Sequence, residues 1–169
     1  MERRVCKTVY VGQVPVGGGA PVTVQSMLNT PAHDIPASVE QARRLQAAGC
    51  DIIRAAVPDR EAVPLIAALK EAVSIPVVAD IHFDYRLALE AAAAGVDKIR
   101  INPGNIGDES RVKAVADACR QRRIPIRIGV NAGSLEKEIL AKYGHPTAEA
   151  MRDSALYHAS LLEKFDFDD

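Results

Sequence analysis

Polar and charged side chains recur at alternate positions in several otherwise apolar segments. Residues two apart on a β-strand point to the same face of a sheet. The segments ADIHF, KIRINP and RIGVN contain such spacings, in Asp80 and His82, Arg100 and Asn102, and Arg127, Gly129 and Asn131. Gln25 in VQSM and Arg54 in IIRAAV add polar groups on two further segments. In parallel α/β folds the carboxyl ends of the strands bind ligands, so we expect these side chains at one mouth.

The three arginines of this set point to an anionic ligand. An arginine does not neutralise itself by losing a proton, so burying it requires an anion. Asp80 can balance only one of Arg54, Arg100 and Arg127. The guanidinium fork suits phosphate oxygens, and the surplus positive charge predicts a dianionic ligand. A structural layer of ion pairs inside the fold is the alternative, and the residue types alone leave it open.

The histidines divide into one candidate for ligand contact and three surface residues. His82 lies beside Asp80 at the end of a predicted strand. Two interpretations stay open there: a histidine that contacts the ligand, and a core histidine held by hydrogen bonds. His33, His145 and His158 have no partner that the sequence identifies, and we expect them at the surface.

Five short β-rich segments, each followed by a helical pattern, must position these residues. They are VTVQSM from Val22, DIIRAAV from Asp51, IPVVADI from Ile75, KIRINP from Lys98 and IPIRIGV from Ile124. The helical pattern after the first ends at Gly49, and Thr147 is a plausible cap of the last. Residues 103–104, Pro-Gly, end the fourth strand. Upstream, TVYVGQVPVGGGAPV predicts a β-hairpin that turns at Gly17–Gly19.

Strand–helix alternation predicts a parallel sheet covered by helices. A doubly wound sheet and a (β/α)8 barrel are the candidates, and the absence of a GxGxxG after the first strand weighs against a dinucleotide-binding fold. A (β/α)8 barrel needs eight units and about 250 residues. Five units in 169 residues therefore predict either a five-stranded open sheet or the first part of a barrel.

The composition is that of an ordinary globular domain. It is 48% hydrophobic and 25% charged, with a formal net charge of -1, so we expect binding to neither nucleic acid nor a membrane surface. No apolar run of about 18 residues predicts a membrane span, and the N-terminus lacks the apolar core of a signal peptide. The cytoplasm is the expected location.

The three cysteines do not form a metal motif. Cys6, Cys50 and Cys119 are far apart in the sequence, with no CxxC pair among them. Cys50 and Cys119 have apolar neighbours and are expected to be buried. We therefore expect no metal site in this chain.

Several long segments resemble one enzyme family. The stretches VQSMLNT, VADIHFDYRLAL, KIRINPGNIGDE and IPIRIGVNAGSLEKEILAKYG, with the opening TVYVGQVPVGGGAP, are similar to the N-terminal part of the 4-hydroxy-3-methylbut-2-en-1-yl diphosphate synthases, which depend on flavodoxin or ferredoxin. The resemblance covers nearly the whole chain. Leu28 stands where the family usually has threonine, and IRAAVP differs from its usual VRVSVP.

The resemblance implies an oxidoreductase of non-mevalonate isoprenoid (terpenoid) biosynthesis. Its fold would be a TIM-type (β/α)8 barrel, remotely similar to dihydropteroate synthase, of which residues 1–169 are the N-terminal, substrate-binding portion, with about five βα units after the hairpin. The reaction would be the reductive ring opening of 2-C-methyl-D-erythritol 2,4-cyclodiphosphate to (E)-4-hydroxy-3-methylbut-2-enyl diphosphate. It implies substrate binding by Arg54, Arg100, Asn102, Arg127 and Asn131, and catalytic roles for Asp80 and His82.

The resemblance also implies parts that this chain lacks. The remaining barrel strands and an iron–sulfur domain with a [4Fe–4S] cluster would lie outside it, with no cluster ligand among its cysteines, so the chain alone would be inactive. Unpaired sheet edges predict association, as in a homodimer. A pteroate-synthase-like transferase and a non-catalytic phosphate-binding module remain the alternative functions.

Overall fold

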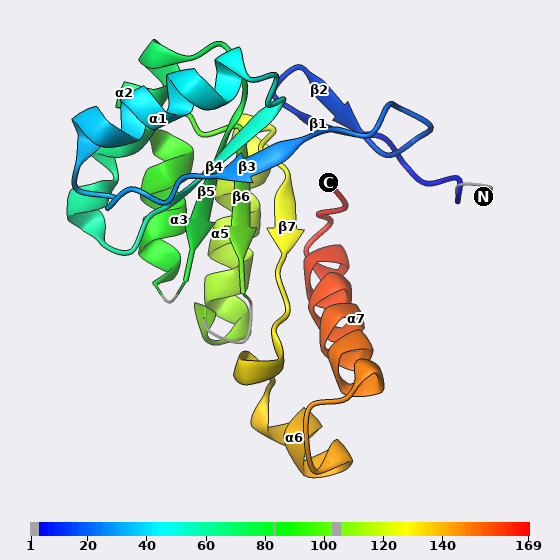
Figure 1. Cartoon of the computed structure of the whole chain (residues 1–169). Coiled ribbons are helices and arrows are strands. Elements are labelled where there is room, and N and C mark those ends of the chain that lie inside the picture. The colour runs from blue at the N-terminus through cyan, green and yellow to red at the C-terminus, as the bar shows by residue number, and fades with distance from the viewer. Residues whose placement is uncertain (1–3, 83, 103–105) are drawn as a thin grey trace.

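The computed structural model describes residues 4–82, 84–102 and 106–169, and its centre is a five-stranded parallel sheet (Figure 1). Across the sheet the strands are β3 (Gln25–Met27), β4 (Ile52–Ala56), β5 (Val77–Ile81), β6 (Lys98–Ile101) and β7 (Ile126–Ile128). Their order in space is their order in the chain, which is how strands follow one another in a (β/α)8 barrel. The predicted partial barrel is thus confirmed. The Pro-Gly stop expected at 103–104 lies outside the described residues.

Helices follow the strands, and those that connect one strand to the next cover one face of the sheet. They are α1 (Ile35–Ala47), α2 (Pro64–Ala72), α3 (Tyr85–Ala93), α5 (Glu109–Arg122), α6 (Lys137–Tyr143) and α7 (Ala148–Lys164), with 3-10 turns η1 (Arg60–Ala62) and η2 (Ala132–Ser134). The Thr147 hydroxyl accepts a hydrogen bond from the Ala150 amide at 3.0 Å, which confirms it as the cap of α7. Within the described residues, no helix is both long and apolar enough to span a membrane.

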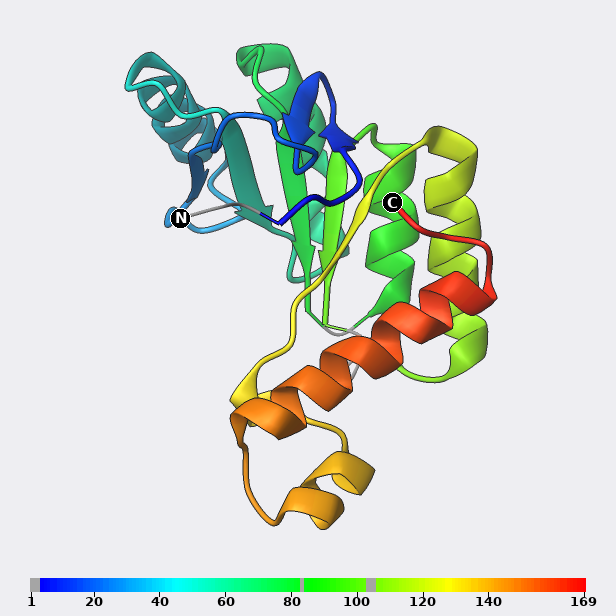
Figure 2. The same ribbon diagram turned by 90° about the vertical axis from the view of Figure 1, so that its right-hand side faces the viewer.

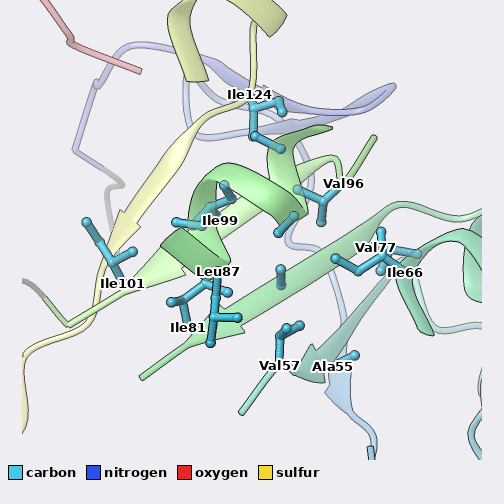
Figure 3. Packing of buried hydrophobic residues seen from close by; sticks show 14 of the residues in the cluster. Ala55, Val57, Ile66, Val77, Ile81, Leu87, Val96, Ile99, Ile101 and Ile124 are labelled. Carbon is cyan, nitrogen blue, oxygen red and sulfur yellow. The ribbon is translucent and has the colours of Figure 1, made fainter. Parts of the chain in front are cut away.

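The helix-covered face of the sheet is apolar in its four strands from β4 to β7, and Ser26 of β3, in register with Ile53, is the polar residue at its edge. Ile53 on β4 is fully buried on this face. Val77 and Ile81 on β5, and Ile99 and Ile101 on β6, are fully buried against the helices as well (Figure 3). Because side chains alternate between faces, the intervening residues of the same strands point to the opposite face, which we call the inner face. All the polar side chains picked out by their spacing therefore belong to the inner face.

The N-terminal hairpin covers one end of the inner face. It pairs β1 (Val9–Val11) with β2 (Val14–Val16), and Val11 packs against Ile52 and Val78. The hairpin was predicted, but its expected turn at Gly17–Gly19 is wrong. Val11 pairs directly with Val14, so the turn is Gly12–Gln13, where Gly12 has a φ of +57 that favours glycine.

The carboxyl ends of the strands lie at the opposite end of the sheet, which we call the mouth. The hairpin lies at the amino ends of the strands, whereas η2 and α6 lie beyond the tip of β7 (Figure 1). Helix α7 then runs back alongside α5 and β7 (Figure 2). Beyond the end of α7, the carbonyl of Asp169 accepts a hydrogen bond from the Ile126 amide of β7 at 3.0 Å.

Candidate anion-binding site

The inner-face residues near the mouth form a layer at one height across the sheet. Asp80 on β5 is in register with Arg100 on β6, and Arg100 with Arg127 on β7. Arg54 on β4 lies one step closer to the hairpin, in register with Val78. Parallel pairing therefore brings together side chains that are up to about seventy residues apart in the chain.

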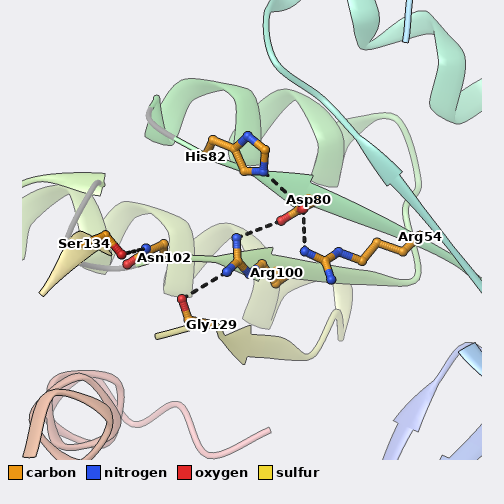
Figure 4. A network of polar contacts seen from close by, with 7 residues as sticks. All are labelled: Arg54, Asp80, His82, Arg100, Asn102, Gly129 and Ser134. Atoms are coloured by element: carbon orange, nitrogen blue, oxygen red, sulfur yellow. Dashed lines mark hydrogen bonds and ion pairs between the residues drawn. The ribbon is translucent and has the colours of Figure 1, made fainter. Parts of the chain in front are cut away.

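Asp80 is the centre of this layer (Figure 4). Its carboxylate is completely buried and accepts from Arg54 Nη2 at 2.5 Å and from Arg100 Nη1 at 3.1 Å. The His82 ring nitrogen Nε2 lies 3.1 Å from the Asp80 oxygen that Arg54 also contacts. One carboxylate thus orients two guanidinium groups and an imidazole.

Asp80 remains ionised in these surroundings. Burial alone would raise the pKa of the Asp80 carboxyl, but the hydrogen bond from Arg54 and the charges of Arg54 and Arg100, with a further hydrogen bond from His82, lower it below its usual range. The acid is therefore an anion at neutral pH and serves as a counter-ion for the arginines.

Arg100 is held on its other side by the backbone directly after β7. Its Nη2 donates to the Gly129 carbonyl at 3.1 Å, and its side chain is only 9% exposed. A Cβ on residue 129 would lie 2.0 Å from Arg100 Nε, so any larger residue there would force the guanidinium out of this position.

Asn102 and Asn131 extend the site towards the mouth. Asn102 is buried and its amide nitrogen donates to the Ser134 hydroxyl on η2. With the Asn131 amide turned so that its oxygen faces Arg100, that oxygen accepts from Arg100 Nη2 at 3.2 Å and the amide nitrogen donates to the Val130 carbonyl at 3.2 Å. Both predicted asparagines therefore lie beside the arginine layer.

Two cations of the inner face have no carboxylate partner within the described part of the chain. Arg127 is exposed and belongs to no ion pair there. Lys98, one layer below Arg100, is half-buried and donates to Gln25 Oε1 at 3.3 Å. Burial, followed by the charges of Arg127 and Arg54, lowers the pKa of Lys98. The inner face thus carries more positive charge than Asp80 neutralises.

Other contacts were missed by the sequence reasoning or expected wrongly. Ser134 and Lys98 were not predicted as site residues, although Lys98 follows the same alternation as Arg100 and Asn102. Gly129 was placed on the shared strand face, but its contact with Arg100 was not predicted. His158 was expected at the surface, but it is 4% exposed and its Nε2 bonds to Glu136.

The remaining histidines and the cysteines agree better with expectation. His33 and His145 are exposed as predicted, and His33 Nε2 lies 2.9 Å from both Asp59 oxygens, a partner that the sequence did not reveal. Cys50 and Cys119 are buried as predicted, and burial raises the pKa of Cys119 to about 12. Within the described residues, no group of three His, Cys, Asp or Glu side chains could hold a metal ion.

Fold and site together define an α/β protein with a partial barrel whose inner face carries more positive than negative side chains. The chain belongs to the family described as the GcpE TIM-barrel domain, whose model matches residues 6–169. Asn102, Asn131 and the arginine layer all lie within the matched residues.

Curated relatives extend the comparison. The chain is 58% identical over 167 residues to 4-hydroxy-3-methylbut-2-en-1-yl diphosphate synthase (flavodoxin) of Pseudomonas paraeruginosa (strain DSM 24068 / PA7), covering 99% of this chain and 45% of the relative. It is 57% identical over 169 residues to the protein of the same name from Pseudomonas savastanoi pv. phaseolicola (strain 1448A / Race 6), covering 100% of this chain and 46% of the relative. The chain spans less than half the length of these relatives.

Solved structures show the same fold in more distant proteins. Dihydropteroate synthase from Xanthomonas albilineans in complex with 7,8-dihydropteroate has a TM-score of 0.68 and 18% identity, over 95% of this chain and 60% of that one. The 7,8-dihydropteroate synthase from Vibrio fischeri ES114 has a TM-score of 0.69 and 13% identity, over 97% of this chain and 64% of that one. At these identities the likeness concerns the fold alone.

Proposed function

We propose that residues 1–169 are the N-terminal, substrate-binding portion of the barrel of an oxidoreductase in isoprenoid biosynthesis. The enzyme would reductively convert 2-C-methyl-D-erythritol 2,4-cyclodiphosphate to (E)-4-hydroxy-3-methylbut-2-enyl diphosphate. The observation that carries the proposal is the inner-face layer, in which three arginines and a lysine accompany one buried carboxylate. The names of the curated relatives support the choice of reaction.

The cyclic diphosphate supplies the negative charge that this layer lacks. Asp80 engages Arg54 and Arg100 at 2.5 and 3.1 Å, so one further anion is needed for the remaining positive charge. Arg127 is exposed at the same height as Arg100 and can reach a ligand in the mouth. Charge-assisted bonds from guanidinium groups to phosphate oxygens are the strong hydrogen bonds that such a site uses.

The described residues would bind and orient the substrate. Asp80 is completely buried, so in this proposal it acts by fixing Arg54, Arg100 and His82. His82 keeps 40% of its side chain exposed and is placed to contact substrate oxygens, while Asn102 and Asn131 complete the mouth-side contacts. Holding the ring in one orientation lowers the entropic part of the barrier to opening it.

The reduction needs two electrons, which side chains do not supply. A [4Fe–4S] cluster fits the reaction, but the residues of this chain do not fit the cluster. Cys6 is exposed, Cys50 and Cys119 are buried, and the described residues include no metal-holding group. We therefore assign the cluster to residues outside these 169, and we expect this chain alone to be inactive.

The proposal extends to partners and location. The electron donor would be flavodoxin or ferredoxin, the compartment the cytoplasm, and the assembly a homodimer, with no role for nucleic acid or membrane. The outer edge of β3 pairs with no further strand in the described sheet, and such an edge recruits a partner. Light scattering on the purified chain should therefore show self-association, and a clean monomer with cooperative thermal unfolding would contradict the edge argument.

Calorimetry tests the proposed substrate. A protein of the relatives' full length that carries this chain should bind the cyclodiphosphate, and Arg100→Met should weaken that binding by at least about ten-fold. Preference for a pterin diphosphate would favour the pteroate-synthase-like alternative instead. Binding of the cyclodiphosphate without turnover, when the cluster and an electron donor are present, would identify a non-catalytic phosphate-binding module.

A further inference from the structure

The segment that carries Asn131 and Ser134 has little hydrophobic anchoring. Neither η2 nor α6 has a buried residue, and between them only Leu135 is buried, at 7% exposure. A cavity of about 720 Å³ lies between α6 and the start of α5, so α6 gains no close support from that side. Something else must hold this segment over the mouth.

A buried polar cluster provides that anchor. Glu136 directly follows Leu135, and its carboxylate accepts from the Ser154 hydroxyl at 3.1 Å and bonds to His158 Nε2. The His158 side chain is 5% exposed and that of Glu136 is 16% exposed. Burial alone would raise the pKa of Glu136, but the hydrogen bonds, led by that from His158, lower it below its usual range, so the carboxylate is ionised at neutral pH.

The other end of the cluster is fixed to the core. Ser154 and His158 lie one turn apart on the buried stripe of α7, which continues to Leu162. Leu162 belongs to the main hydrophobic core of the sheet. The stripe contacts Glu136 through polar side chains and the core through Leu162. Helix α7 therefore connects Glu136 to the hydrophobic core.

We propose that Glu136, held by Ser154 and His158, is a positioning residue that fixes the Asn131–Ser134 segment over the anion site. Ser134 in turn accepts from Asn102, so the segment is tied at one point to the sheet and at a second to α7. The effect of Glu136 on ligand affinity rests on the proposed function, whereas its effect on how firmly residues 131–134 are held does not.

The test compares variants in a protein of the relatives' full length. Glu136→Ala should weaken cyclodiphosphate binding in calorimetry by about ten-fold, and it should speed hydrogen exchange of amides 131–136 without changing exchange in β5. His158→Gln keeps a donor in place and should retain most of the affinity, whereas His158→Ala should behave as Glu136→Ala does.

Asp153→Asn is the matched control. Asp153 also joins α6 to α7, through Lys142 at 2.7 Å and Tyr143 at 2.5 Å, but it does not touch residues 131–136. It should leave both binding and exchange unchanged. An equal effect of Asp153→Asn, or no effect of either alanine variant on exchange, would overturn the positioning role.

The outcomes separate this inference from the proposed function. If Arg100→Met abolishes binding but Glu136→Ala leaves binding and exchange unchanged, the positioning role fails and the substrate assignment stands. If the wild-type protein does not bind the cyclodiphosphate but Glu136→Ala still releases amides 131–136, the substrate assignment fails and the anchor stands. Should Glu136→Ala not fold, Ser154→Ala and His158→Ala carry the same comparison.

Discussion

Asp80→Asn should destabilise the fold far more than the same substitution at Asp117, an aspartate on the surface that also pairs with two permanently charged cations. Asp80 is completely buried between Arg54, 20% exposed, and Arg100, 9% exposed. Removing one charged partner of a buried ion pair lowers the free energy of unfolding by about 3–5 kcal/mol, because the remaining charge stays buried without its counter-ion. Arg54 can partly regain water and Arg100 cannot, so we expect a loss of about 3 kcal/mol, near the lower end of that range.

Thermal unfolding at one fixed protein concentration measures the effect. For a cooperative unit of 169 residues, a loss of about 3 kcal/mol lowers the Tm by roughly 8 °C. Asp117 on α5 provides the control, because it binds Lys113 at 2.6 Å and Arg120 at 2.8 Å at the surface. Exposed pairs contribute little, so Asp117→Asn should change the Tm by less than about 2 °C.

The pH dependence gives a second, independent readout. The folded-state pKa of Asp80 is lowered, so its stabilising contribution is present above the unfolded pKa of about 3.9 and is lost as pH falls through the folded value. The difference in stability between the wild-type chain and Asp80→Asn should therefore shrink below about pH 4. Equal, small shifts for Asp80→Asn and Asp117→Asn at neutral pH would refute the role of Asp80 as the buried counter-ion.

Three further substitutions probe the rest of the layer. Gly129→Ala should displace the Arg100 guanidinium and cost about 1–3 kcal/mol in chemical denaturation, whereas Gly133→Ala, whose Cβ meets nothing within 4 Å, should be nearly neutral. Lys98→Met should stabilise the ligand-free protein by about 1 kcal/mol at neutral pH, since a half-buried cation is removed. That gain should shrink as pH rises from the lowered Lys98 pKa towards 10.5, and a constant gain would contradict the electrostatic cause. Arg127→Met should weaken cyclodiphosphate binding by about ten-fold or more in calorimetry with no loss of stability, and unchanged affinity would remove Arg127 from the site.

The strand-borne part of the site could be predicted because alternation in a strand has a period of two. Once KIRINP and ADIHF are identified as strands, Arg100 and Asn102 must share a face, as must Asp80 and His82. The order of strands in the sheet then brings the two pairs together. Neither step requires knowledge of side-chain packing.

Contacts made by loops and caps could not be predicted in the same way. Ser134 reaches Asn102 from a 3-10 turn, whose position depends on how α6 and α7 pack. The hairpin turn was misplaced because three consecutive glycines are a stronger turn signal than Gly12-Gln13, although the cross-strand valines select the shorter loop.

The burial of His158 shows how a detectable signal was overlooked. Ala150, Ser154, His158 and Leu162 are each four residues apart, which places them on one stripe of α7. That spacing predicts burial of the histidine, and a buried histidine requires a hydrogen-bond partner. The sequence offers many acidic residues as candidates, so the spacing alone does not identify Glu136.

The two faces of the sheet explain why its charged residues are compatible with a stable fold. The helix-covered face carries apolar side chains in β4 to β7 and forms the hydrophobic core together with the helices. The hairpin adds a small apolar cluster at the amino ends of the strands, around Val11, Ile52 and Val78. Charge on the sheet is thus confined to the inner face, and Asp80, Arg100 and Arg127 lie in the mouth half of that face, where a ligand can neutralise the excess positive charge. Because the core does not depend on that half, substitutions at exposed Arg127 should alter binding without unfolding the protein, whereas those at buried Asp80 should alter both.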